Sequence, residues 1–159
     1  MSELNIGDSA PDFTLPTDGE GEITLSSLKG QKVVIYFYPK DDTPGCTKES
    51  QGFNEALDAF KALNTNIIGI SKDSVAKHDK FKAKYDLQFP LASDENGTTC
   101  EDYDVWKEKN MYGKKYMGIE RTTFLIDENG KIAQIWRKVK VAGHVEAVQA
   151  EAQSIAQAA

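Results

Sequence analysis

Residues 32–38 constrain the fold of this chain more than any other segment. They read Lys-Val-Val-Ile-Tyr-Phe-Tyr, a run of β-branched and aromatic residues in which polar and apolar positions do not alternate. Such a run is typical of a strand that is buried on both faces of a sheet. Pro39 ends the run, because proline has no N–H to donate to a neighbouring strand. We therefore expect a buried strand here, followed by a turn.

The remaining segments predict an alternation of helices and strands. The order β-α-β-α-β-α-β-β-α implies an α/β protein with a thioredoxin-like fold, in which a central mixed sheet is flanked by helices on both faces. No linker or internal repeat divides residues 1–159, so we expect a single domain. After short strands and turns over 6–28 and the strand 32–38, the expected elements are a helix with Phe53, Leu57, Phe60 and Leu63 on one face, a strand over 66–71, a helix from about 74 to 85, a short strand near 89–92, a short helix over 98–105, a hairpin of 122–126 and 131–136 with its turn at 127–130, and a closing helix from His144.

Charge and composition exclude several classes of function. The net charge of −6 and the pI near 5.0 argue against nucleic acid as a partner, which would require clustered basic residues. No apolar run approaches the roughly 18 residues that a membrane span requires. The first five residues lack the basic and apolar regions of a secretory signal, so we expect a cytoplasmic protein. With two histidines and two cysteines, no metal site or cofactor site is expected.

Cys46 lies where the buried strand gives way to a helix. A cysteine in a cytosolic domain is usually a small buried apolar residue, so a local feature must indicate more. The unpaired N–H groups and the positive dipole end of the expected helix favour an anion, and they would stabilise a thiolate there. Thr43 can direct its hydroxyl at the sulfur or at an oxygen beside it, while Pro39 and Pro44 stiffen the loop.

The surroundings of Cys46 narrow its chemistry. A disulfide-exchange protein would carry a second cysteine close by, but residues 47–49 are Thr, Lys and Glu. A cysteine hydrolase would need a histidine base, and neither His78 in mid-helix nor His144 at the start of the last helix is an obvious candidate. A solitary activated cysteine suits oxidation by a peroxide through a sulfenic acid.

The pattern P-x-x-x-T-x-x-C of Pro39, Thr43 and Cys46 resembles the signature of the peroxiredoxin family. Nearly the whole chain is similar to the bacterioferritin-comigratory, or Q-type, subfamily. The segments that carry this wider similarity are 10–13 (Ala-Pro-Asp-Phe), 118–126, 105–106, 111–114, 136–141 and 143–144.

The resemblance implies a role for each residue of the site. Cys46 is the peroxidatic residue that reduces hydrogen peroxide and organic hydroperoxides, Thr43 bonds to the peroxide, and Pro39 shields the sulfur. Arg121 holds the thiolate and polarises the O–O bond, with the N–H groups of Gly45 and Cys46 as further donors. Glu49 either orients the site by pairing with an arginine or is a solvated surface residue. The rival interpretation is a peroxide sensor or redox-dependent binding module that does not turn over.

The sequence departs from the subfamily where a resolving cysteine is expected. Gln51 stands five residues after Cys46, and residues 81–83 are Phe, Lys and Ala. Two cycles therefore remain open: direct reduction of the Cys46 sulfenate by an external thiol, or an internal disulfide with Cys100. The second requires the two α-carbons to come within about 7 Å. Thioredoxin, glutaredoxin or a small thiol would supply the electrons, and the resemblance implies a monomer or a weak dimer.

Overall fold

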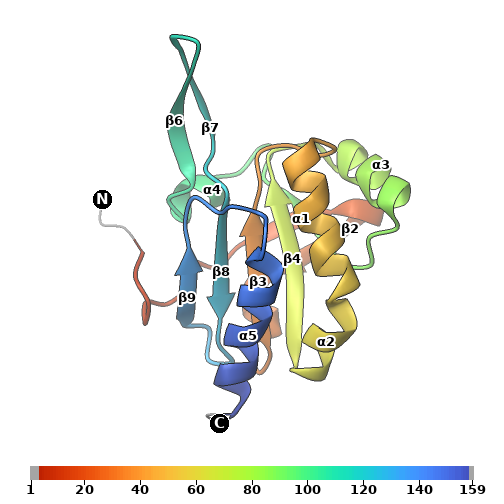
Figure 1. Cartoon of the computed structure of the whole chain (residues 1–159), viewed down its shortest axis with the longest axis vertical. Coiled ribbons are helices and arrows are strands. Elements are labelled where there is room, and N and C mark those ends of the chain that lie inside the picture. Colours follow the sequence, from red (N-terminus) through yellow and green to blue (C-terminus); the bar gives the residue numbers. More distant parts are fainter. Residues whose placement is uncertain (1–3, 158–159) are drawn as a thin grey trace.

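The computed structural model describes residues 4–157, which form the arrangement of helices and strands in Figure 1. Residues 1–3, on which the expectation of no export signal partly rests, lie outside this part of the chain. The elements in chain order are β1 (Thr14–Thr17), η1 (Asp18–Glu20), β2 (Gly21–Thr24), η2 (Leu25–Leu28), β3 (Lys32–Phe37), α1 (Pro44–Glu55), α2 (Leu57–Ala62), β4 (Thr65–Ser71), α3 (Val75–Tyr85), β5 (Leu91–Ser93), α4 (Thr99–Asp102), β6 (Trp106–Met111), β7 (Lys114–Ile119), β8 (Thr122–Ile126), β9 (Ile132–Trp136) and α5 (His144–Gln157).

The strand expected at 32–38 is β3, and it lies inside a seven-stranded sheet. The strand order is β2-β1-β5-β4-β3-β8-β9. β3 pairs in parallel with β4 and antiparallel with β8, so the sheet is mixed as expected. All six residues of β3 are buried, which agrees with the unbroken apolar run. The thioredoxin-like α/β fold class is confirmed.

Side chains that alternate along β3 divide the core into two layers. Val33, Ile35 and Phe37 belong to one apolar cluster, which the segment around Phe13, η2 and α4 cover. Val34, Tyr36 and Tyr38 belong to the other cluster, which receives side chains from α1, α2, α3 and α5. Helical segments thus cover both faces of the sheet, although those on the first face are short.

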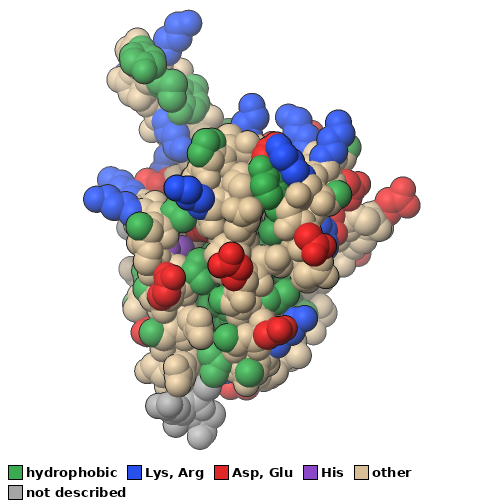
Figure 2. Space-filling model, turned by 45° about the vertical axis from the view of Figure 1, so that its right-hand side comes forward, with side chains coloured by type: hydrophobic (Ala, Val, Ile, Leu, Met, Phe, Trp, Pro, Cys, Tyr) green, Lys and Arg blue, Asp and Glu red, His purple; other side chains and the backbone are tan. Residues whose placement is uncertain are grey.

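The structure adds a two-stranded ribbon that the sequence patterns do not predict. β6 and β7 pair over six residues each and project from the body of the molecule (Figure 1). The ribbon carries lysines and exposed hydrophobic side chains, visible at the top of Figure 2, and Tyr112 at its tip is 99% exposed. A segment with so little buried surface shows no clear apolar period. Its turn is formed by Tyr112 and Gly113, both with positive φ (53° and 81°), as a tight hairpin turn requires.

The helix expected from the spacing of Phe53, Leu57, Phe60 and Leu63 is two helices. α1 ends at Glu55 and α2 begins at Leu57, with Ala56 between them at φ −89° and ψ 1°. The two helices still bury a common apolar side. Phe53, Leu57 and Phe60 all lie in the second cluster, with Leu63 packed against it. The periodic pattern therefore identified the buried side correctly but not the break.

Gly69 of β4 offers a test of how closely this core is packed. A Cβ atom added to Gly69 would lie 2.8 Å from the Tyr36 ring and 3.0 Å from Leu91 Cδ2. We expect Gly69→Ala to lower the free energy of unfolding by about 1–3 kcal/mol through overpacking. Chemical denaturation followed by circular dichroism measures this change, and a loss below ~0.5 kcal/mol, the size of an ordinary surface substitution, would contradict the close contact.

Candidate active site

Cys46 occupies the first turn of α1, directly after β3 and its connecting loop. Thr43 precedes the helix in an extended conformation (φ −96°, ψ 154°) and Pro44 is its first residue. The N–H of Thr47 makes the first helical bond, 2.8 Å to the carbonyl of Thr43. The N–H groups of Gly45 and Cys46 precede that bond and have no partner within the helix. The Cys46 side chain is fully buried at this end, where the helix favours a negative charge.

Arg121 lies opposite Cys46 because β8 pairs with β3. Phe37 at the end of β3 is the register partner of Thr122 at the start of β8, so Arg121 lies just beyond the end of β3. Its Nη2 donates to Cys46 Sγ at 3.3 Å. Its Nη1 donates to Glu49 Oε1 at 2.7 Å. One guanidinium therefore joins two residues of α1 that are separated by almost one turn.

Gly45 permits this close approach. A Cβ atom at position 45 would lie 3.1 Å from Arg121 Nη2, closer than side chains ordinarily pack. The predicted supporting role of Gly45 therefore has a steric component in addition to its N–H group. Sequence reasoning considered only the N–H.

Glu49 is buried in the pair with Arg121, and it is not a solvated surface residue. Its side chain is fully buried, and Oε2 has no hydrogen-bond partner among the described residues. Burial raises the pKa of Glu49 to about 7, although the adjacent Arg121 opposes the shift. Burial lowers the pKa of Arg121, but the charges of Glu49 and Cys46 outweigh this effect and the net shift is upward. The guanidinium is charged at every relevant pH.

His144 at the start of α5 completes the buried cluster behind Arg121. Its Nε2 lies 2.8 Å from Thr123 Oγ1 and 3.8 Å from Glu49 Oε2. Burial and the nearby Arg121 lower the pKa of His144 to about 4, so the ring is neutral near pH 7. The sequence showed His144 only as the first residue of the last helix. No local pattern indicated that it would reach Glu49.

Thr43 and Pro39 belong to the loop that leads into α1. The Thr43 hydroxyl donates to the carbonyl of Lys40 at 2.8 Å, which leaves its oxygen free to accept a hydrogen bond. Pro39 is exposed and follows the fully buried Tyr38. Its role as a shield for the sulfur stays a prediction.

Lys109 of β6 is a charged neighbour that sequence reasoning missed. Burial and the adjacent Arg121 lower the pKa of Lys109, while the Cys46 sulfur acts in the opposite direction. The residue belongs to the projecting ribbon, so a charge on the ribbon lies near enough to Arg121 and Cys46 to interact with them. No pattern near position 109 distinguished it from an ordinary surface lysine.

The two cysteines lie in different layers of the core. Cys46 belongs to the apolar cluster on the α1 side of the sheet, and Cys100 belongs to the cluster on the other side. Both are free thiols. Burial and the adjacent Asp94 raise the pKa of the Cys100 thiol strongly, so it is protonated and a poor nucleophile. The sheet separates the two sulfurs in this conformation.

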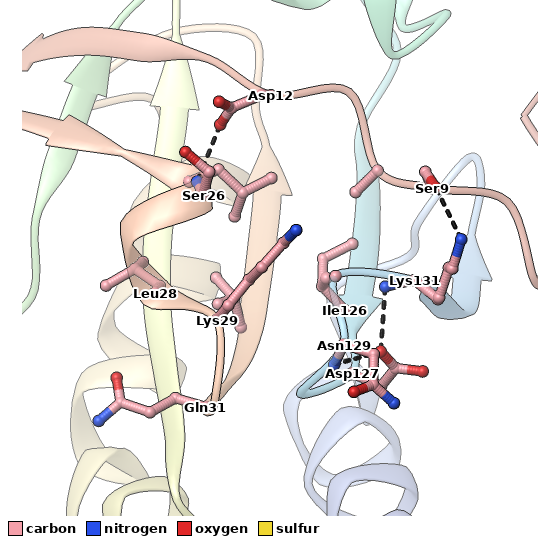
Figure 3. A pocket seen from close by; sticks show the side chains of 14 residues that line it. Ser9, Asp12, Ser26, Leu28, Lys29, Gln31, Ile126, Asp127, Asn129 and Lys131 are labelled. Atoms are coloured by element: carbon pink, nitrogen blue, oxygen red, sulfur yellow. Dashed lines mark hydrogen bonds between the residues drawn. The ribbon is translucent and has the colours of Figure 1, made fainter.

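A surface hollow lies at the far end of β3 from Cys46. Its lining includes Val33 from the start of β3 and Ile126 from the end of β8, with Ser9, Lys29 and Lys131 around it (Figure 3). Neither Cys46 nor Arg121 belongs to the lining. The Cys46 sulfur therefore lies at the opposite edge of the sheet from this hollow. Among residues 4–157, no group of His, Cys, Asp and Glu side chains is arranged to hold a metal ion, and no helix is long and apolar enough to cross a membrane.

Comparison with known proteins places this geometry in a family. The pattern of the AhpC/TSA family matches residues 6–135. A Coxiella burnetii protein described as a putative peroxiredoxin Bcp is 58% identical over 146 residues, which cover 91% of this chain and 96% of that protein. The peroxiredoxin Bcp of Bacillus subtilis is 50% identical, with 92% of this chain and 94% of the relative covered. A Xanthomonas campestris bacterioferritin comigratory protein, studied for alkyl peroxide reduction, has a similar structure with a TM-score of 0.87, 49% identity, and coverage of 91% and 92%.

Glu49 and His144 should have opposite effects on stability as the pH changes. The pKa of Glu49 is raised from 4.5 to about 7, so the stability it supplies is full below pH 4.5 and is lost as the pH rises to about 7. The pKa of His144 is lowered from 6.5 to about 4, so its contribution is full above pH 6.5 and is lost as the pH falls to about 4. Between pH 4.5 and 6.5 the loss of stability through Glu49 and the gain through His144 should largely cancel.

We therefore expect the Glu49→Gln variant to show the pH dependence of the free energy of unfolding that His144 alone produces. Between pH 4.5 and 6.5 the free energy of unfolding of the variant should rise with pH by up to about 3 kcal/mol more than that of the unchanged protein. Urea denaturation at several pH values measures this difference. His144→Gln is the matched control and should show the opposite slope. Equal slopes in all three proteins would show that these groups do not titrate as described.

Proposed function

The chain is a peroxiredoxin of the AhpC/TSA family, a thiol-dependent peroxidase, and on this premise we propose that Cys46 is its peroxidatic residue, assisted by Thr43, Arg121 and Pro39. The observation that carries the assignment is the double contact of Arg121. Its guanidinium bonds to Cys46 Sγ at 3.3 Å and to Glu49 Oε1 at 2.7 Å. A cation held this close to a buried sulfur favours the thiolate, which is the nucleophile.

The first half of the cycle is a displacement at oxygen. The Cys46 thiolate attacks one oxygen of the hydroperoxide, the S–O bond forms, and the O–O bond breaks. The leaving alkoxide or hydroxide takes a proton and departs as alcohol or water, and Cys46 is left as a sulfenic acid. Arg121 and the N–H groups of Gly45 and Cys46 donate to the oxygens as charge develops. Thr43 aligns the peroxide, because its hydroxyl oxygen can accept a hydrogen bond from it.

The second half of the cycle proceeds without Cys100 in our proposal. The position of Cys100 across the sheet, and its protonated state, favour reduction of the Cys46 sulfenate by an external thiol. That thiol forms a mixed disulfide with Cys46 and releases water, and a second thiol then frees Cys46. Thioredoxin, glutaredoxin or a small thiol can fill this role. An internal Cys46–Cys100 disulfide would require α1 or α4 to leave its place.

Substrate, assembly and location follow from the same premise. The relative from Xanthomonas was studied for alkyl peroxide reduction, which supports organic hydroperoxides as substrates here beside hydrogen peroxide. We infer a monomer in the cytoplasm, where free thiols such as Cys46 and Cys100 persist. A weak dimer is the alternative. The peroxide sensor is not favoured, because the relatives are themselves named peroxiredoxins.

Replacement of each cysteine tests the proposed cycle. Cys46→Ser should abolish peroxide reduction. Cys100→Ser should keep it within twofold, because no step passes through that sulfur. Turnover with a small thiol, and intact mass after one equivalent of peroxide with a sulfenate trap, measure both effects. Loss of two hydrogens in the unchanged protein but not in Cys100→Ser would establish the internal disulfide instead. No rapid modification of Cys46 would refute the assignment of the peroxidatic residue.

Arg121→Lys tests the bidentate hydrogen bonding of the guanidinium separately from its charge. Lysine keeps the positive charge but cannot bond to Cys46 and Glu49 from two nitrogens at once. We expect the second-order rate constant with peroxide to fall by about 10²–10³, the usual loss for a donor to a developing oxyanion. Stopped-flow kinetics of the reduced protein give this constant. A fall of less than threefold would mean that charge alone suffices.

A further inference from the structure

His78 is a buried histidine outside the described site, and both of its ring nitrogens are engaged. It lies on α3 with no exposed surface. Nδ1 is 2.6 Å from Asp41 Oδ2, and Nε2 is 3.0 Å from the carbonyl oxygen of Ala92. In the sequence His78 is not an obvious candidate for a catalytic base, and the peroxidase chemistry above does not use it.

These contacts determine where the protons lie. A carbonyl oxygen only accepts, so Nε2 carries the hydrogen in its bond to Ala92. Asp41 Oδ1 accepts a further bond, at 2.5 Å, from the Tyr38 hydroxyl. Burial raises the pKa of Tyr38 well above 10, so this hydroxyl is a donor at every relevant pH. Asp41 Oδ2 and His78 Nδ1, which lie 2.6 Å apart, are joined by the hydrogen that lies between them. His78 and Asp41 thus form a hydrogen-bonded pair in which both ring nitrogens and both carboxyl oxygens have partners.

Asp41 lies in the loop between β3 and α1, with Pro39 two residues before it and Thr43 two residues after it. The main-chain N–H of Asp41 donates to Asp73 Oδ2 at 2.8 Å, and Ser71 Oγ donates to the same oxygen at 2.7 Å. The loop is thus fastened at Asp41 through both its side chain and its main chain. The groups that hold Asp41 come from the residue after β3, from α3 and from the segment after β4.

The next residue of the loop is held by α3 as well. Asp42 has a positive φ of 60°, a conformation that few residues other than glycine adopt. Its carboxylate accepts bonds from Lys84 Nζ at 2.9 Å and from Tyr85 OH at 2.7 Å. Side chains of α3 therefore hold two consecutive residues of the loop, Asp41 and Asp42, and the second of them has a positive φ.

We propose that the His78–Asp41 pair is a positioning pair that places Thr43 for peroxide alignment. The inference rests on the proposed roles of Thr43 and Cys46. Cys46 is activated from the other side, by Arg121 at the start of β8 and Glu49 on α1, and neither residue contacts His78 or Asp41. Release of the pair should therefore disturb peroxide alignment and leave the reactivity of the thiolate almost unchanged.

The protonation of His78 can be measured without any assay of activity. Nitrogen-15 NMR of the histidine ring distinguishes a nitrogen that carries a proton from a bare one. At pH 7 we expect Nε2 of His78 to carry a proton, as its bond to the Ala92 carbonyl requires, whereas neutral His144 should have one bare nitrogen and serves as an internal reference. A bare Nε2 on His78 would overturn the hydrogen-bonded arrangement of the pair. This result does not depend on whether the protein reduces peroxides.

Kinetics of three variants test the positioning role. Asp41→Ala removes the pair. Asp41→Asn can keep both hydrogen bonds, from the Tyr38 hydroxyl and to a neutral His78 ring. Lys80→Gln changes an exposed residue of α3 and is the control. Two rates are measured on each reduced protein: reaction with hydrogen peroxide by stopped flow, and alkylation of Cys46 by iodoacetamide. Circular dichroism verifies the fold.

The two rates should respond differently. In Asp41→Ala the peroxide rate should fall about 10- to 100-fold, as expected for a misplaced aligning group, while alkylation stays within twofold. Asp41→Asn should recover the peroxide rate to within threefold, and Lys80→Gln should match the unchanged protein. An undiminished peroxide rate in Asp41→Ala, an equal fall of both rates, or no recovery in Asp41→Asn would overturn the proposal. Absence of peroxide reaction in the unchanged protein would instead refute the proposed function.

Discussion

The site depends on one interaction, the contact of the Arg121 guanidinium with Cys46 and Glu49. The guanidinium is a permanent charge in a largely buried position, and burial of a charge is costly unless partners compensate for it. Glu49 and Cys46 supply that compensation from one helix, at 2.7 and 3.3 Å. Because Arg121 adjoins β8 and its partners lie on α1, the contact also fixes the helix against the sheet edge. The same contact that favours the thiolate therefore helps to hold the site together.

Two groups of side chains support the short loop that precedes α1. Arg121, Glu49 and His144 form a buried cluster on one side of it, and they set the charge around Cys46. His78 and its partner Asp41 lie on the other side, and they set the path of the backbone toward Thr43. Each cluster contains one carboxylate and one histidine. Burial and the nearby Arg121 keep the ring of His144 neutral, whereas the ring of His78 pairs directly with Asp41.

Sequence reasoning predicted the elements of the site that depend on local structure. The run at 32–38, the stop at Pro39 and the helix start before Cys46 are set by residues close together in the chain, and all three were recognised. Arg121 was identified only by resemblance, since alone it is an ordinary charge near a strand. For Glu49 the sequence left two interpretations, a partner of an arginine or a solvated surface residue, because a helical glutamate can be buried or exposed. Its burial depends on residues 72 or more positions away.

The sequence by itself determined the fold class, the position of Cys46 at the start of a helix and the absence of a second cysteine where the subfamily expects one. Periodicity and turn chemistry act over a few residues, so they can be read along the chain. Only the tertiary structure decided that the sheet separates Cys46 from Cys100, that His144 lies behind Glu49, and that His78 holds the loop through Asp41. Those relations join residues that are 37 or more positions apart, and they exist only once the strands have paired and the helices have packed on the sheet.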